Sequence, residues 1–448
     1  MRTRIRNRWL IVVGAVMIQL ALGAIYAWSV FTRKLTDAEG VYQFTAGEAA
    51  WVFSSGLAVF AIVMVLAGRW LPRIGPQKMA IAGGLLLGSG YVLGGLFGSN
   101  FWSQLLFIGV IGGAGIGLAY VVPISVGVKW FPDRKGLITG LAVAGFGFGA
   151  TIWVKLAGSW FGGLINTTHL FGLPGVQSVF VIYGVSFAVL VLLGSIVMVN
   201  PPEGYLPDGW EPGAGARGES KEVREFSVTE MLRTPQFYML WSVFMFSALA
   251  GLMVIYCIRL FGLDALTFHG VTDAGVVAGT AMAWYAILNG IGRVAWGSIS
   301  DHIGRRNAIM LMTVMQGLTV LSIYHGFIGF GSSLGLIIGS SLIGFNFGGN
   351  FALFPAATAD YFGNKSVGTN YGWVFTSYGI AGIAGPQIAG HFKDAAGFSV
   401  YPVHWMPAFI IAGVVCLLGA VIIFYARSPQ TEPESNCDSL QTVGAQAR

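Results

Sequence analysis

The chain has 448 residues and a formal net charge of +6; 55% of its residues are hydrophobic and only 10% are charged. Soluble domains carry roughly a quarter charged residues, so this composition excludes an ordinary soluble protein and is typical of a membrane protein. The basic residues form no continuous stripe, which argues against nucleic-acid binding. Cys257, Cys416 and Cys437 show no paired spacing and predict neither a disulfide framework nor a metal site.

The N-terminus combines a basic start with a long apolar run. Arg2, Arg4, Arg6 and Arg8 precede this run, as they would in a secretory signal peptide. The apolar part of a signal peptide is usually about 7–15 residues long. The run at 9–31 is long enough to cross a bilayer, so we interpret it as a first transmembrane helix that the mature protein keeps.

Apolar stretches of roughly 20 residues recur along the rest of the chain. They predict twelve spans in all, at 9–31, 48–70, 78–98, 102–130, 136–163, 176–199, 235–260, 272–298, 305–330, 333–360, 367–391 and 404–426. A proline-rich, charged linker at 200–234 separates an N-terminal unit of six helices (1–199) from a C-terminal unit (235–426). The polar tail at 427–448 is predicted to be disordered.

The orientation follows from the distribution of lysine and arginine. Two of the 25 basic residues, Lys155 and Arg293, fall inside spans. Most of the others lie in the N-terminus, the linker, the C-terminal tail and the loops on that side. The opposite loops hold only Arg33, Lys34, Arg259 and Lys393. Because cytoplasmic loops are enriched in basic residues, we expect a multi-pass protein of the cell inner membrane with both termini and the linker in the cytoplasm.

The two halves repeat a loop pattern at equivalent places. The residues from Gly68 to Gly75 follow the second span, and those from Gly297 to Arg306 follow the eighth. The second copy resembles the loop motif of the major facilitator superfamily (Gly-x3-Asp-x2-Gly-Arg-[Lys/Arg]). The first copy departs from it, since Pro72 stands where Asp is usual. The resemblance implies an all-α membrane protein with twelve transmembrane helices in two six-helix bundles, and a substrate site between the bundles near the membrane midplane.

Two longer stretches narrow the resemblance. The residues at 22–31 (LGAIYAWSVF) resemble the first helix of the oxalate–formate antiporter group. Those at 130–145 (WFPDRKGLITGLAVAG) resemble a signature shared with monocarboxylate transporters. The resemblance implies a carrier for small carboxylate anions.

Arg293 is the sharpest candidate for a binding residue. It lies inside the eighth span, about 12 Å of helical rise before Asp301. A charge at that depth is costly and needs a partner or a wet cavity. Asp273, Asp360 and Glu48 lie near span ends, so no acidic partner is expected deep in the membrane. A substrate carboxylate, which arginine can bind with two hydrogen bonds, would complete the site. The alternative is a structural arginine bonded to backbone carbonyls.

Tyr285 and Asn289 precede Arg293 at helical spacing and predict a polar stripe on one face. Many monocarboxylate transporters carry Asp where Asn289 stands, and that Asp is implicated in proton coupling, which Asn cannot replace. Oxalate carriers place a lysine about where Tyr378 falls. Because two cations suit a dianion and one suits a monoanion, Tyr378 favours a monocarboxylate.

Helical spacing adds four further candidates for the cavity: Tyr26, Tyr120, Asn350 and Phe354. Buried tyrosines and asparagines are commonly hydrogen-bonded structure, so each alone also fits a packing role. Lys155 could face the cavity or extend toward the membrane surface. If it faces the cavity, the argument for a monoanion weakens.

The predicted function is secondary active transport of lactate- or pyruvate-like monocarboxylates by alternating access, with proton symport favoured by the family resemblance. A carboxylate exchanger of the oxalate–formate type, or a multidrug or sugar carrier, remains open. No HExxH motif is present, and no GxSxG with partners, so an enzyme is not expected. No cofactor is implied; the expected partners are the carboxylate, protons and the lipid bilayer.

Overall fold

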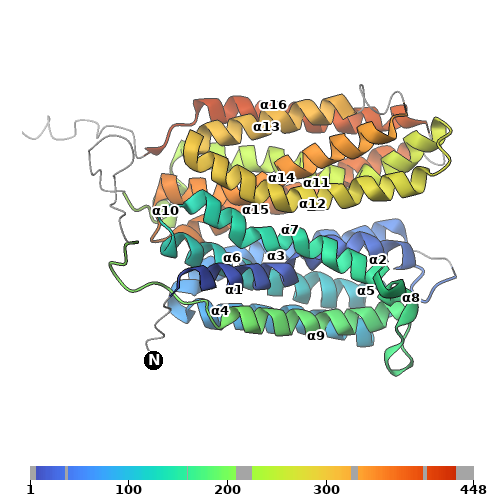
Figure 1. Cartoon of the computed structure of the whole chain (residues 1–448), viewed down its shortest axis with the longest axis horizontal. Helices are drawn as coiled ribbons and strands as arrows, with labels where there is room; N and C mark the ends of the chain where they lie inside the picture. The colour runs from blue at the N-terminus through green and yellow to red at the C-terminus, as the bar shows by residue number, and fades with distance from the viewer. Residues whose placement is uncertain are drawn as a thin grey trace, which may run out of the picture.

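The computed structural model describes residues 7–35, 39–158, 160–207, 224–323, 331–396 and 401–429. Two bundles of long helices lie side by side, the N-terminal one below and the C-terminal one above in Figure 1. The N-terminus, the linker helix α10 (Val228–Met231) and the end of α16 lie at the same end of the molecule, which we call the linker end. The opposite end is the far end.

The N-terminal bundle contains six membrane-crossing segments, three of them interrupted or followed by short irregular turns. Their bounds are α1 Trp9–Leu22 continued by η1 Gly23–Ala27 and α2 Trp28–Leu35; α3 Ala46–Ile74; α4 Pro76–Phe97; α5 Phe101–Gln104 continued by η2 Leu105–Gly112 and α6 Gly113–Trp130; α7 Lys135–Gly158; and α9 Gly175–Ser195. The short elements η3 Trp160–Gly162, α8 Leu164–Thr167 and η4 Leu170–Gly172 connect α7 with α9 at the far end.

The C-terminal bundle repeats this arrangement with helices that are mostly uninterrupted. Its members are α11 Pro235–Phe268, α12 Ala274–Ile303, α13 Arg305–Ser322, α14 Ser333–Phe362, α15 Val367–Ala396, and η6 Pro402–Trp405 leading into α16 Met406–Tyr425. Bulky apolar side chains remain exposed on the outer faces, for example Val185 on α9 and Val421 on α16. Such surfaces are stable against hydrocarbon, not water.

Ten helices in the described residues are long and apolar enough to cross a membrane on their own. The other two of the expected twelve are α13, which begins with two arginines and an asparagine, and α15, which buries Asn370 and Ser377 inside the protein. Polar residues lower the mean hydropathy of these helices without removing them from the bundle. The predicted fold, twelve helices in two bundles, is confirmed.

The seventh span ends later than expected, and this adds a buried acidic residue. The span predicted at 235–260 continues as α11 to Phe268, so Asp264 lies inside a helix and is only 8% exposed. Its carboxylate accepts a hydrogen bond from the Trp405 indole N–H at 3.2 Å. Apolar composition marks the membrane core, whereas the helix extends two turns past it toward the far end. Asp264 lies near the end of α11, and the described residues show no ion pair between it and Arg293.

The repeated loop pattern has one backbone conformation. A glycine directly follows the last residue of each helix: Gly75 follows α3 and Gly304 follows α12, with φ of 87° and 85°. Only glycine adopts this conformation without strain, so it permits the next helix to start at once, at Pro76 and at Arg305. The repeat read from the sequence is thus present in the structure.

The described end of the linker is docked on the C-terminal bundle. The Glu225 carboxylate accepts hydrogen bonds from the backbone N–H groups of Asn364 at 3.1 Å and Lys365 at 2.9 Å. Phe226 is buried, and its N–H donates to the Phe362 carbonyl. In α10, hydrogen bonds from the Ser227 side chain and backbone lower the pKa of Glu230. The rest of the linker (208–223) and the predicted disordered tail from 430 onward lie outside the described residues.

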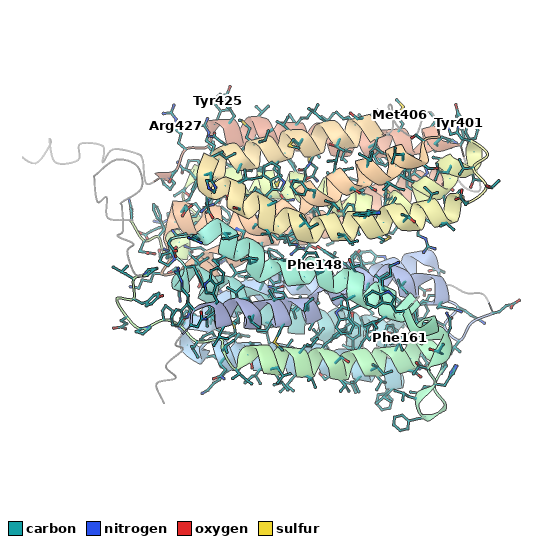
Figure 2. All side chains as sticks on the ribbon, viewed as in Figure 1. Phe148, Phe161, Tyr401, Met406, Tyr425 and Arg427 are labelled. Atoms are coloured by element: carbon teal, nitrogen blue, oxygen red, sulfur yellow. The ribbon has the colours of Figure 1, made fainter. Side chains whose placement is uncertain are left out.

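The bundles meet along α7 with α12 and α14 on one side, and α3 with α15 on the other. Close approach depends on glycine: a Cβ on Gly136 or Gly297 would collide with the backbone of the other. Phe148 points from α7 into the space between the bundles (Figure 2) and lies against Gly290 of α12. On the second side, the Thr369 hydroxyl donates to the Gly68 carbonyl at 2.7 Å.

Candidate functional site

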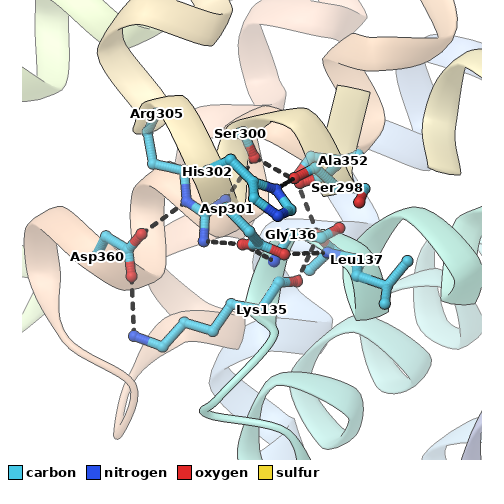
Figure 3. Close-up of polar contacts among 12 residues, drawn as sticks. Lys135, Gly136, Leu137, Ser298, Ser300, Asp301, His302, Arg305, Ala352 and Asp360 are labelled. Carbon is cyan, nitrogen blue, oxygen red and sulfur yellow. Dashed lines mark hydrogen bonds and ion pairs between the residues drawn. The ribbon is translucent and has the colours of Figure 1, made fainter. Parts of the chain in front are cut away.

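At the linker end, ion pairs join the two bundles (Figure 3). The Asp301 carboxylate, at the end of α12, accepts hydrogen bonds from the backbone N–H groups of Gly136 at 3.0 Å and Leu137 at 2.8 Å, in the first turn of α7. Arg305 contacts both Asp301 and Asp360 at 2.7 Å. Lys135 of α7 reaches Asp360 at 2.9 Å. We call these six residues (Lys135, Gly136, Leu137, Asp301, Arg305 and Asp360) the latch, because their contacts join the two bundles at the linker end.

A cavity of about 660 Å³ lies between the bundles on the other side of the latch. Its walls come from α7, α11 and α12, with Tyr26 and Val30 from the first span. Gly158, Arg259 and Gly275, near the far ends of these three helices, all line it. The cavity therefore runs from the far end toward the middle of the molecule. This is the shape that one state of an alternating-access carrier requires.

Arg293 lies just below this cavity and is fully buried. Its Nε donates to the Asn289 side-chain oxygen at 3.2 Å, and its Nη1 donates to the Val143 carbonyl of α7 at 3.0 Å. Its Nη2 has no hydrogen-bond partner among the described residues, and no carboxylate there forms an ion pair with it. The guanidinium thus bridges the two bundles and keeps one donor nitrogen available.

Aromatic rings enclose the guanidinium. Its carbon lies 4.2 Å from the centre of the Phe351 ring and 5.2 Å from that of Phe146. Ring faces attract a cation and exclude water, which strengthens the attraction between the arginine and an entering anion. Phe146 comes from α7 and Phe351 from α14, so both bundles contribute.

A pair of tyrosines forms the second bridge between the bundles. The hydroxyls of Tyr26 and Tyr378 lie 2.5 Å apart. Tyr26 also packs edge-on against Phe146 with 5.1 Å between ring centres, and Tyr120 packs against Phe146 at 5.7 Å. The Tyr120 hydroxyl has no hydrogen-bond partner among the described residues. These rings place three hydroxyl groups inside an otherwise apolar region.

The structure brings most of the predicted residues into one region. Tyr26, Tyr285 and Asn289 line the cavity. Arg293 is bonded to Asn289, Tyr378 is bonded to Tyr26, and Tyr120 packs against Phe146. Tyr285 donates to the Gly251 carbonyl at 3.1 Å, which is a structural bond.

Asn350 and Phe354 of α14 do not line the cavity. Asn350 donates to the Phe347 carbonyl, and Phe354 stacks on Phe244 with 4.4 Å between ring centres. Both residues therefore contact neighbouring aromatic residues, which fits a role in helix packing.

Sequence reasoning missed Phe146, Phe351 and the Val143 carbonyl. Phe351 follows Asn350 directly, and Phe146 follows the signature at 130–145 by one residue. No spacing within one helix shows that α7 and α14 meet at Arg293. Among the described residues, no group of His, Cys, Asp or Glu could hold a metal ion.

Comparison with known proteins places the chain in a family. The family model described as Major Facilitator Superfamily matches residues 7–281 and 270–440. The oxalate:formate antiporter of Oxalobacter formigenes is 26% identical over 419 residues, covering 92% of this chain and 90% of the relative. Apicoplast pyruvate carrier 1 of Toxoplasma gondii is 26% identical over 457 residues, covering 84% and 82%.

Two solved structures share the fold. FucP in the outward conformation superposes with a TM-score of 0.62 at 16% identity, covering 93% of this chain and 99% of that one. The proton:xylose symporter XylE gives 0.68 at 13% identity, covering 94% and 96%. The helices, the repeated loops and the matches over nearly the whole length agree: the chain is a membrane transporter that belongs to the Major Facilitator Superfamily.

Proposed function

We propose that this transporter moves small monocarboxylate anions of the lactate or pyruvate type by alternating access around Arg293. One observation carries the proposal: a fully buried guanidinium between the bundles with an unpartnered Nη2. A carboxylate bound there would neutralise the charge and form strong, charge-assisted hydrogen bonds. The names of the two relatives, an oxalate:formate antiporter and a pyruvate carrier, support a carboxylate.

The substrate is a monoanion because a second cation close to Arg293 is missing from the described residues. Tyr378 stands where the resemblance to oxalate carriers implies a lysine. Its hydroxyl is hydrogen-bonded to the Tyr26 hydroxyl. Lys155 does line the cavity, but it lies three helical turns from Val143, about 18 Å along α7. A small dicarboxylate cannot bridge that distance, so Lys155 does not supply the second charge at this site.

Proton symport is the favoured coupling, with exchange of carboxylates as the alternative. Asn289 orients Arg293 and holds no proton, so the proton must travel with the substrate, with water or on the tyrosines. In the expected orientation, with both termini in the cytoplasm of the cell inner membrane, the cavity is open to the outside. Substrate and proton would enter there together.

Reconstituted protein tests the proposal directly. Liposomes containing the purified chain would be tested with lactate, pyruvate, acetate, formate and oxalate, with and without a pH gradient. Accumulation of a monoacid driven by the gradient supports symport. Exchange of oxalate for formate that ignores the gradient would replace symport by the exchanger. If no carboxylate is transported and a sugar or a hydrophobic drug is, the substrate class is wrong.

A further inference from the structure

Two cations line the outer part of the cavity, one from each bundle. Lys155 stands on α7 of the N-terminal bundle, and Arg259 stands on α11 of the C-terminal bundle. Arg259 is exposed and forms no ion pair with a carboxylate among the described residues. The far end carries few basic residues, yet two of them line the same cavity.

Among the described residues that line the cavity, none is Asp or Glu. Asp264 lies at the same end but accepts from Trp405, away from the cavity, and Asp273 is exposed beyond its lining. Apolar residues make up most of the wall, and a low-dielectric wall concentrates the field of the charges it carries. The outer cavity is therefore electropositive.

A run of residues on α7 leads from this outer region to the buried arginine. Val143, Gly147, Thr151 and Lys155 follow one another at intervals of four residues, so each lies about one helical turn from the next. The first accepts from Arg293, and the other three line the cavity. The Thr151 hydroxyl is buried and has no hydrogen-bond partner among the described residues. It is an available polar group one turn below Lys155.

We propose that Lys155, Thr151 and Arg259 form a capture site for an organic carboxylate, which binds there before it moves inward to Arg293. The inference rests on the proposed function, because it names where the same substrate first binds. Lys155 and Arg259 attract and hold the carboxylate, and Thr151 donates to it as it moves down α7. Gly147, one turn below Thr151, lines the inner part of the cavity, where a Cβ would meet the Gly290 backbone of α12.

The placement of the cations on different bundles gives the capture site a second role. Closing the far end brings α7 and α11 together, and with them two like charges in a cavity of low polarity. An anion between them removes this repulsion, so the loaded carrier closes more readily than the empty one.

Kinetics of carboxylate uptake by the full-length protein in liposomes tests the capture site. Arg259→Gln, and the double variant with Lys155→Gln, are expected to raise KM for the best monocarboxylate about threefold to tenfold and to leave kcat within about twofold. They should also weaken the dependence of uptake on ionic strength. Arg259→Lys, which keeps the charge, should restore most of the wild-type KM.

Lys34→Gln is the matched control, since Lys34 is exposed at the same end and does not line the cavity. Its KM should not change. The capture site is refuted if Arg259→Gln and the double variant behave like Lys34→Gln while Arg293→Gln still abolishes uptake; the proposed function then stands. If wild-type protein transports no carboxylate at all, the proposed function fails, and the capture site fails with it.

Discussion

Arg293 is buried in the centre of the protein with one terminal nitrogen left without a partner among the described residues. A structural arginine would be saturated by carbonyls, as Nη1 is by Val143. An unsaturated one is costly to the folded protein and is kept for a ligand. Function and stability are therefore expected to respond in opposite directions when its charge is removed.

Arg293→Gln should reduce monocarboxylate uptake by at least about a hundredfold, because the charge that binds the anion is lost. The melting temperature in detergent should stay the same or rise, since an incompletely paired buried charge disappears. Fluorescence-monitored unfolding beside the uptake assay checks both. A strongly lowered melting temperature would instead assign the arginine a structural role.

The sequence predicts the centre of the site better than its walls. Arg293 stands out because charges inside spans are rare, and Asn289 follows from helical spacing. Phe146 and Phe351 carry no such signal, since aromatic residues are common throughout the chain. What makes them part of the site is the contact of α7 and α14 across the bundle interface, which is a tertiary property.

At the scale of helices, the latch joins the two bundles at the linker end, and we expect it to keep that end closed. Asp301 of α12 binds the first turn of α7, where the positive end of the helix dipole and two free N–H groups favour a carboxylate. Asp301→Asn should weaken the closed linker end by about 2 kcal/mol, which changes the ratio of the two states by roughly thirtyfold.

The Asp301→Asn shift can be measured as increased labelling of a cysteine placed at Leu137 by a water-soluble thiol reagent in detergent. Asp133→Asn is the control, because Asp133 pairs with Arg8 inside the N-terminal bundle at 2.9 Å and does not cross the interface. Equal labelling in Asp301→Asn and Asp133→Asn would show that the latch does not hold this end closed.

Glycine at the crossing of α7 and α12 sets a second condition for closure. In Gly297→Ala the new methyl group meets the backbone of Gly136, so the helices must move apart and the linker end opens. In Gly275→Ala, on the same helix, the methyl group enters open space. We expect increased labelling at Leu137 only in the first variant. Equal labelling in both would mean that the helices tolerate the wider spacing.

Helix ends are the least predictable feature at this scale. The membrane core explains where apolar residues start and stop, but α11 continues to Phe268, beyond the expected end at 260. Helices continue beyond the membrane core because their backbone hydrogen bonds remain favourable outside it. Gly75 and Gly304, by contrast, were predicted as repeat positions, since a positive φ demands a specific residue.

For the whole molecule, the distribution of basic residues predicts that the linker end faces the cytoplasm. Phe161 and Arg427 lie at opposite ends in Figure 2. In a variant with Cys437→Ser, Phe161→Cys should react with a membrane-impermeant thiol reagent in intact cells, and Arg427→Cys should react only after the membrane is opened. Cys257 and Cys416 are buried and give little background. The reverse labelling pattern would invert the topology and the direction in which the cavity opens.

The two sides of the bundle interface are held unequally at the linker end. Asp301 attaches α12 to α7 through charge, whereas Pro72, at the equivalent place on α3, offers no side-chain acceptor to α15. There the neutral bond from Thr369 to Gly68 and the cation–π contact of Arg69 with Trp373, at 5.6 Å from the ring centre, join the helices without an ion pair among the described residues. When the carrier turns inside out, we therefore expect separation to begin along α3 and α15 and to pivot about α7 and α12. The departing substrate then leaves by an off-centre exit next to α15.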